Sequence, residues 1–280
     1  MDARRTAIVV TAAALGFVAL TWGTARFMRA TRAEHVGEVP AAADTGEPVA
    51  IKFYRNPAPV PTFTMRDLDG RTIDSQSLRG KVVLLNFWAT WCPPCRAEIP
   101  DLIGLQEKYR DRLQIVGISE DEAPPDVVRR FVAEHRMNYP VVMLTPELEK
   151  MFPGVVALPT SFVIDRESRI VQKHVGQLTA ALTEAETRAL AGLPVNARIE
   201  HVDQAQGLKL ENGAQATNIP GVDLASLTPE RRTEALQKLN AEPCTCGCDL
   251  TVARCRVDDP NCGISLPLAR DIVKQVTQQR

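Results

Sequence analysis

Two cysteines separated by two prolines, in the stretch Trp91–Cys95 (WCPPC), are the residues of this chain best suited to chemistry. A strand-like apolar run (82–88) precedes them and a helix-like segment (96–109) follows. The first N–H groups of a helix lack partners within the helix, and the helix dipole favours negative charge there. A thiolate at Cys92 is therefore stabilised and can act as a nucleophile near neutral pH. Cys95, about one turn along, can close a disulfide or release a trapped partner.

The alternative for this stretch is half of a zinc site. Zinc needs two further ligands at a matching spacing. A tryptophan before the cysteines, two prolines between them and a helix after them are unlike a zinc knuckle. The pattern therefore favours redox chemistry.

Length and charge limit the classes of function. The 280 residues are enough for one large core and additional parts, and the formal net charge is −1, from 33 basic and 34 acidic residues. No long basic run is present, so we expect no nucleic-acid partner. Seven cysteines are many for a reducing cytosol, which favours a location outside the cytoplasm.

The amino end predicts a membrane anchor. Arg4 and Arg5 precede an uncharged apolar segment (7–23), which is near the lower limit for a spanning helix. A cleaved signal peptide is the alternative, and we assign residues 1–28 to one or the other. We expect a protein anchored in the inner membrane, with its soluble part in the periplasm.

Residues 29–57 are expected to form a linker with a short strand at 51–54, and residues 58–192 an α/β domain. Asp69-Gly70 predicts a turn between short strands. The remaining periodicity predicts strand 82–88, helix 93–110, strand 113–119, helix 124–137, strand 140–144, helix 146–152, a hairpin of strands 161–165 and 169–176, and helix 179–192. This order indicates a mixed sheet with helices on both faces and a site at the carboxyl end of a central strand.

A linker (193–226) and a small cysteine-rich, helical region (227–280) are expected to follow. Thr228 and Pro229 are typical of the first positions of a helix. Five cysteines crowd into this region: Cys244, Cys246, Cys248, Cys255 and Cys262. Three interpretations stay open, namely a copper or zinc site, two stapling disulfides, or a second redox relay.

The motifs NFWATWCPPCRAEIP (86–100) and ALPTSFVID (157–165) resemble the thioredoxin superfamily, specifically the TlpA/ResA type of membrane-anchored thiol–disulfide oxidoreductase. The resemblance covers roughly residues 58–192 and implies a thioredoxin-like fold. It implies that Cys92 attacks a substrate disulfide and that Cys95 resolves the mixed disulfide. It further implies a cis peptide bond before Pro159, and substrate contacts by Trp91, Pro93, Pro94, Leu158 and Thr160.

The same resemblance assigns Glu98 to proton exchange with Cys95. Thioredoxin itself has a buried aspartate six residues before its first cysteine, where this chain has Asn86. An amide cannot exchange that proton, which leaves Glu98 as the expected relay. The alternative for Glu98 is a solvated carboxylate that only complements the helix dipole.

The resemblance implies a reductase that needs no dissociable cofactor. Its substrates would be protein disulfides, for example in apocytochrome c or copper-site assembly proteins, and a membrane electron donor of the CcdA/DsbD type would re-reduce it. One alternative is a disulfide oxidase or isomerase with the same fold. Another is a metal-handling protein that binds copper or zinc through its late cysteines.

Overall fold

The structure, a computed structural model, describes residues 47–204, 210 and 212–278. Within these residues, no helix has both the length and the apolar character needed to cross a membrane. The anchor or signal peptide expected at residues 1–28 lies outside the described residues, so it stays a prediction.

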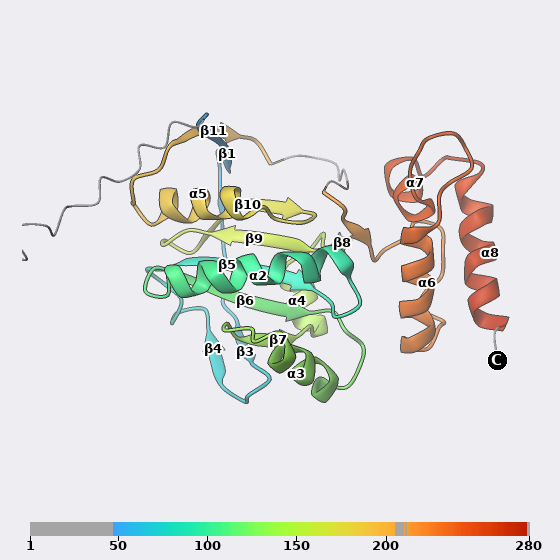
Figure 1. Ribbon diagram of the computed structural model, residues 1–280, viewed down its shortest axis with the longest axis horizontal. Coiled ribbons are helices and arrows are strands. Elements are labelled where there is room, and N and C mark those ends of the chain that lie inside the picture. Colours follow the sequence, from blue (N-terminus) through green and yellow to red (C-terminus); the bar gives the residue numbers. More distant parts are fainter. Residues whose placement is uncertain (1–46, 205–209, 211, 279–280) are drawn as a thin grey trace, which may run out of the picture. The chain divides into compact units, whose positions relative to one another are not determined.

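A six-stranded mixed sheet forms the centre of the described chain (Figure 1). Its strands, in spatial order, are β2 (Ala58–Pro59), β10 (Arg169–Val175), β9 (Thr160–Ile164), β5 (Val82–Trp88), β6 (Leu113–Ser119) and β7 (Val141–Met143). Strands β5, β6 and β7 are parallel, whereas β9 is antiparallel to β5 and β10 is antiparallel to β9. The mixed sheet expected from the sequence is confirmed.

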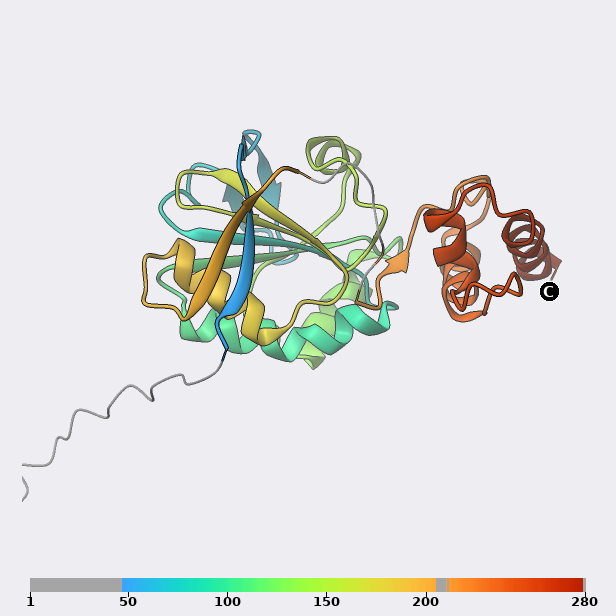
Figure 2. The ribbon, with the colours of Figure 1, turned by 90° about the horizontal axis from the view of Figure 1, so that it is seen from above.

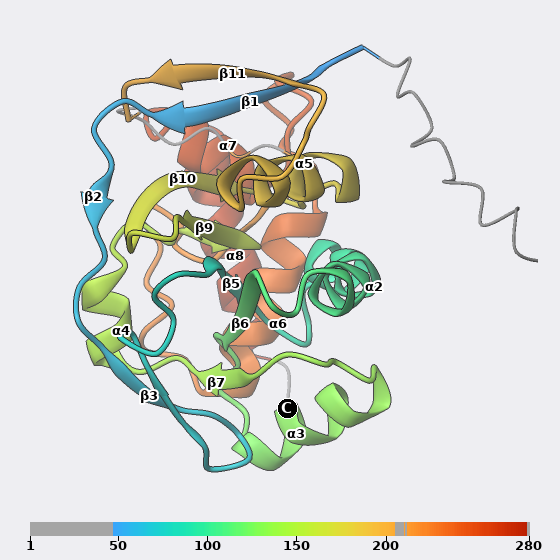
Figure 3. The ribbon, with the colours of Figure 1, turned by 90° about the vertical axis from the view of Figure 1, so that its left-hand side faces the viewer.

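Helices cover both faces of this sheet. Helix α2 (Pro93–Lys108) packs against β6 and against α5 (Ala180–Leu190), while α4 (Pro146–Met151) lies across the opposite face (Figure 3). Helix α3 (Pro125–Glu134) is shorter than the expected helix 124–137. It stops because His135 caps it and Arg136 takes a positive φ of 52°, which does not continue a right-handed helix.

Strand β5 determines where the cysteines lie. All seven of its residues are buried, as expected for a central strand covered on both faces. Its parallel register with β6 runs from Val82 opposite Leu113 to Trp88 opposite Ser119. The carboxyl ends of both strands therefore meet at one edge of the sheet, and the WCPPC stretch begins three residues after Trp88.

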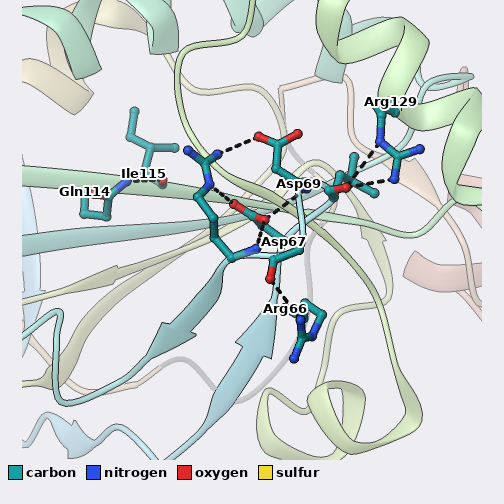
Figure 4. A network of polar contacts seen from close by, with 9 residues as sticks. Arg66, Asp67, Asp69, Gln114, Ile115 and Arg129 are labelled. Carbon is teal, nitrogen blue, oxygen red and sulfur yellow. Dashed lines mark hydrogen bonds and ion pairs between the residues drawn. The ribbon is translucent and has the colours of Figure 1, made fainter.

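The turn at Asp69-Gly70 is confirmed between β3 (Thr64–Arg66) and β4 (Thr72–Asp74), with Gly70 at a φ of 83°. The buried carboxylate of Asp67 organises this turn (Figure 4). It accepts hydrogen bonds from the backbone N–H groups of Asp69 and Arg71 and from Nε of Arg71. These bonds satisfy the buried carboxylate and hold the turn in its conformation.

Two segments expected to be linkers contribute strands. Strand β1 (Val49–Tyr54), which contains the short strand expected at 51–54, pairs in parallel with β11 (Ala197–Val202) beside the main sheet (Figure 2). Ile51 and Phe53 of β1 are buried in the main core. The pairing needs residues far apart in sequence, so local periodicity did not indicate it.

Three helices form the carboxyl-terminal region: α6 (Pro229–Ala241), α7 (Val252–Asp258) and α8 (Ser265–Gln278) (Figure 1). They pack on one another around a second hydrophobic cluster that includes Leu239, Val252 and Ile272. The expected start of α6 is confirmed, since Oγ1 of Thr228 accepts the N–H of Arg231 and Pro229 is the first helical residue.

Candidate active site

Cys92 and Cys95 are joined by a disulfide at the start of α2. Cys92 is the N-cap residue, and its Sγ accepts the backbone N–H of Cys95 at 3.3 Å. After reduction, the same N–H group and the helix dipole would stabilise a thiolate on Cys92. Neither cysteine is open to solvent: the exposed fractions of Cys92 and Cys95 are 0% and 1%.

The loop between β5 and α2 is held by a carboxylate from the segment that follows the neighbouring strand β6. Asp121 follows β6 and is buried, and its two oxygens accept the N–H and the hydroxyl of Thr90 at 2.9 and 2.5 Å. Ser119 donates its hydroxyl to the same carboxylate. This network fixes the start of the cysteine stretch, and it joins residues 31 apart in sequence, so no local pattern predicts it.

The second expected motif lies beside the first. Strand β9 pairs with β5 so that Thr160 is opposite Phe87, which brings residues 157–160 to the edge where Cys92 lies. The Leu158–Pro159 bond is cis, the isomer that the resemblance implies. Leu158 and Thr160 are buried, and the Thr160 hydroxyl donates to the carbonyl of Ala157 at 2.6 Å. A substrate contact at Leu158 or Thr160 remains a prediction.

The other expected substrate contacts differ in exposure. Pro93 is exposed, whereas Trp91 and Pro94 are half-buried. Trp91 packs against both the main core and the carboxyl-terminal cluster. The structure therefore brings all the residues predicted around the disulfide to one edge of the sheet, while their roles toward substrate stay predictions.

Glu98 is buried, with 1% of its surface exposed, so the alternative of a solvated carboxylate is wrong. Its Oε1 accepts a hydrogen bond from Nδ2 of Asn86 at 2.7 Å, and its Oε2 accepts the N–H of Leu178 at 2.8 Å. Burial nevertheless raises the pKa of Glu98 to about 7, because removing the charged form from water outweighs these two bonds. Such a carboxyl can take or give a proton near neutral pH.

A second carboxyl with a raised pKa was missed by the sequence analysis. Glu120 follows β6, and its N–H donates to the carbonyl of Trp88. Burial, followed by the nearby Glu149 and Asp121 carboxylates, raises the pKa of Glu120 to about 8. Its position directly after β6, the parallel neighbour of β5, is the signal that could have placed it at this edge.

Four of the late cysteines form a tight cluster, and the thiol of the fifth, Cys248, contacts Cys246 at its edge. The Sγ atoms of Cys244, Cys246, Cys255 and Cys262 all lie within 4.8 Å of one another. Cys248 is exposed and does not belong to this group. Four convergent thiols are a donor set suited to a soft or borderline metal ion.

Comparison with known proteins identifies relatives of the region that carries the disulfide. The model of the AhpC/TSA family matches residues 57–173. "Thiol-disulfide oxidoreductase ResA" of Bacillus thuringiensis subsp. konkukian (strain 97-27) is 38% identical over 122 residues, which are 42% of this chain and 69% of that protein. "Thioredoxin-like protein YneN" of Bacillus subtilis (strain 168) is 35% identical, with 42% of this chain and 71% of that protein covered. The crystal structure of a thioredoxin-family thiol:disulfide interchange protein from Chlorobium tepidum TLS is 36% identical, with a TM-score of 0.47 and coverage of 49% and 98%.

Proposed function

Because this chain belongs to the family of ResA-type thiol–disulfide oxidoreductases, we propose that it reduces disulfide bonds of proteins outside the cytoplasm through Cys92 and Cys95. One observation carries the proposal. A Cys-x-x-Cys disulfide lies at the first turn of α2, and the sulfur of Cys92 accepts a helix N–H there. Reduced at this position, Cys92 is a stabilised thiolate, which is the attacking species in disulfide exchange.

The reaction proceeds in two exchanges. The Cys92 thiolate attacks one sulfur of the substrate disulfide, so a mixed disulfide forms and the other substrate sulfur leaves as a thiolate. The thiol of Cys95 loses its proton, and its sulfur attacks that of Cys92. This restores the Cys92–Cys95 disulfide and releases the substrate as a dithiol. Glu98 is the group that accepts the proton of Cys95, since it lies one turn further along α2 and its pKa is about 7.

Two electrons must then return to the protein. We propose that a membrane electron donor of the CcdA/DsbD type supplies them, and that the substrates are apocytochrome c or copper-site assembly proteins. Anchoring of the chain in the inner membrane by residues 7–23 would keep the periplasmic domain close to such a donor. The uncharged run in the sequence supports this anchoring.

The direction of electron flow is tested by the reduction potential of the Cys92–Cys95 pair. The full chain would be equilibrated with glutathione buffers, and the redox state of the Cys92 peptide read by differential alkylation and mass spectrometry, so the late cysteines stay native. We expect a value near that of thioredoxin, about −270 mV. A value near that of the oxidant DsbA, about −120 mV, would instead support the oxidase alternative.

A second function is favoured by the four-cysteine cluster. The Sγ of Cys244 is 3.4 Å from that of Cys246, which is 3.8 Å from that of Cys255. Four thiolates about 2.3 Å from a tetrahedral zinc ion are separated by about 3.8 Å, so the cluster needs little adjustment to bind zinc. We propose a closed structural zinc site that holds the small region around α6, α7 and α8 together.

The zinc site predicts different results for two serine variants. Cys255→Ser removes a buried ligand and is expected to lose the bound zinc and to lower the melting temperature of the carboxyl-terminal region, because zinc binding contributes directly to folding. Cys248→Ser is the matched comparison: it removes a thiol that contacts Cys246 but is not one of the four convergent ligands, so it should keep both. The measurement is metal content after purification, together with thermal unfolding. Copper in place of zinc, or disulfides among these cysteines, would contradict the zinc site.

A further inference from the structure

The backbone next to the cis proline is occupied by another part of this chain. Strand β12 (Gln215–Ala216) pairs antiparallel with β8 (Ala157–Leu158), with Gln215 opposite Leu158 and Ala216 opposite Ala157. The pairing continues beyond the strand, since the N–H of Thr217 donates to the carbonyl of Val156 at 2.9 Å. We call residues 212–218 the covering segment.

The covering segment also reaches the cysteine helix. The carbonyl of Asn212 accepts the N–H of Gln177, and a Cβ atom on Gly213 would be 3.9 Å from Cβ of Pro94. Ala157 and Ala216 are fully buried where the two strands meet. The segment thus extends from the first turn of α2 to the loop before Pro159.

A side chain from α6 clamps the outer edge of β12. Asn240 is buried, its Oδ1 accepts the N–H of Ala216 at 2.7 Å, and its Nδ2 donates to the carbonyl of Ala216 at 2.8 Å. This amide satisfies both polar groups that a further strand would otherwise bind. The covering segment is therefore tied to the carboxyl-terminal region, and Arg232 of α6 adds an ion pair with Glu122.

An extended peptide can be bound by adding a strand to a free sheet edge, where backbone groups supply the hydrogen bonds. The resemblance implies a substrate contact at Leu158, and in this structure Gln215 is paired with that residue. Cys92 also has no exposed surface, although a protein disulfide has to reach its sulfur. The chain itself therefore covers the position that a protein substrate has to reach for disulfide exchange.

We propose that the covering segment occupies the edge of β8 to which a protein substrate would bind as an added strand. A protein substrate must then displace the segment to reach Cys92. This inference rests on the proposed function, because it specifies how access to the same site is controlled. The carboxyl-terminal region then acts as an autoinhibitory unit: Asn240 holds β12 on β8, and release of that strand uncovers the backbone of Leu158 for an incoming strand.

The test weakens the covering strand without touching the active-site residues. Thr217→Pro removes the N–H that donates to Val156, and Ala216 already has the extended conformation that a residue before proline adopts. In the reduced full chain, we expect iodoacetamide to alkylate Cys92 about five- to tenfold faster in T217P, the effect of losing one backbone hydrogen bond. Mass spectrometry of the Cys92 peptide separates this signal from the late cysteines.

Thr217→Ala is the matched control, since it shortens the same side chain and keeps the N–H, and it should react at the wild-type rate. Asn240→Ala is the second variant, and circular dichroism shows which variants fold. Equal alkylation rates in T217A and in every folded weakening variant would overturn the covering proposal. Reduction of insulin is measured in parallel: faster alkylation with no insulin reduction in any variant would refute the reductase function but keep the covering segment.

Discussion

Cys92→Ser is expected to reduce disulfide reductase activity below detection, whereas Cys95→Ser is expected to accumulate a covalent complex with substrate. The difference follows from position. Cys92 is the N-cap of α2 and its sulfur accepts a helix N–H, so a hydroxyl in its place removes the nucleophile itself. Without Cys95 the first exchange still takes place, but no second sulfur is available to resolve the mixed disulfide.

Activity is measured as the rate of insulin reduction with dithiothreitol as reductant. The covalent complex is sought separately: reduced protein that has been freed of dithiothreitol is mixed with insulin, quenched with acid and run on a non-reducing gel. Cys248→Ser is the control, because Cys248 is exposed and lies outside the four-cysteine cluster. A complex formed by the Cys92→Ser protein, or normal activity of that protein, would show that another cysteine is the attacking residue.

The sequence was sufficient for elements whose signal is local. Short, mostly apolar runs predicted β5 and β6 at their observed bounds, and Thr228 with Pro229 predicted the start of α6. In each case burial or a helix cap is determined by adjacent residues. The disulfide was predictable for the same reason, since its two cysteines are separated by two residues.

What the sequence did not show depends on contacts between distant residues. The clamp of Asn240 on Ala216 joins residues that are 24 apart, and the bond from Leu178 to Glu98 joins residues that are 80 apart. Asn240 in particular lies inside α6, where an asparagine in the sequence pattern does not indicate a contact with another element. Its role became visible only when α6 was placed beside β12.

The buried pair of Asn86 and Glu98 shows why an amide suits this site. Nδ2 of Asn86 donates both to Glu98 and to the hydroxyl of Ser161, at 2.7 and 3.0 Å. When Glu98 is protonated, the Asn86 amide can rotate so that its oxygen accepts a hydrogen bond from the Glu98 carboxyl group. The same oxygen can accept one from the Ser161 hydroxyl, because a hydroxyl can donate as well as accept. Asn86 can therefore hydrogen-bond to Glu98 whether or not Glu98 is protonated. An ionised aspartate in its place would put a second negative charge beside Glu98.

Glu98→Gln is accordingly expected to slow the resolving step by about 100-fold or more without disturbing the packing. The turned Asn86 amide can accept a hydrogen bond from the amide introduced at this position, so the variant loses the titration and keeps its hydrogen bonds. In the wild type the resolving rate should rise as pH increases through about 7, because the deprotonated carboxylate is the base. The variant should lack that rise. Stopped-flow measurement of the resolving step between about pH 5.5 and 8.5 separates the two, and an unchanged pH profile would exclude Glu98 as the relay.

Stability gives an independent measurement on the same variant. The folded-state pKa of Glu98 is about 7, above its ordinary value of 4.5, so the folded protein binds more protons than the unfolded chain between these values. The free energy of unfolding of the wild type therefore falls as pH rises from about 4.5 through 7, by on the order of 3 kcal/mol from this group. Glu98→Gln removes that loss, while the raised pKa of Glu120 affects both proteins equally. Urea unfolding should thus show the variant gaining on the wild type from about pH 5 to pH 7.5, whereas a constant difference across this range would mean that Glu98 does not titrate there.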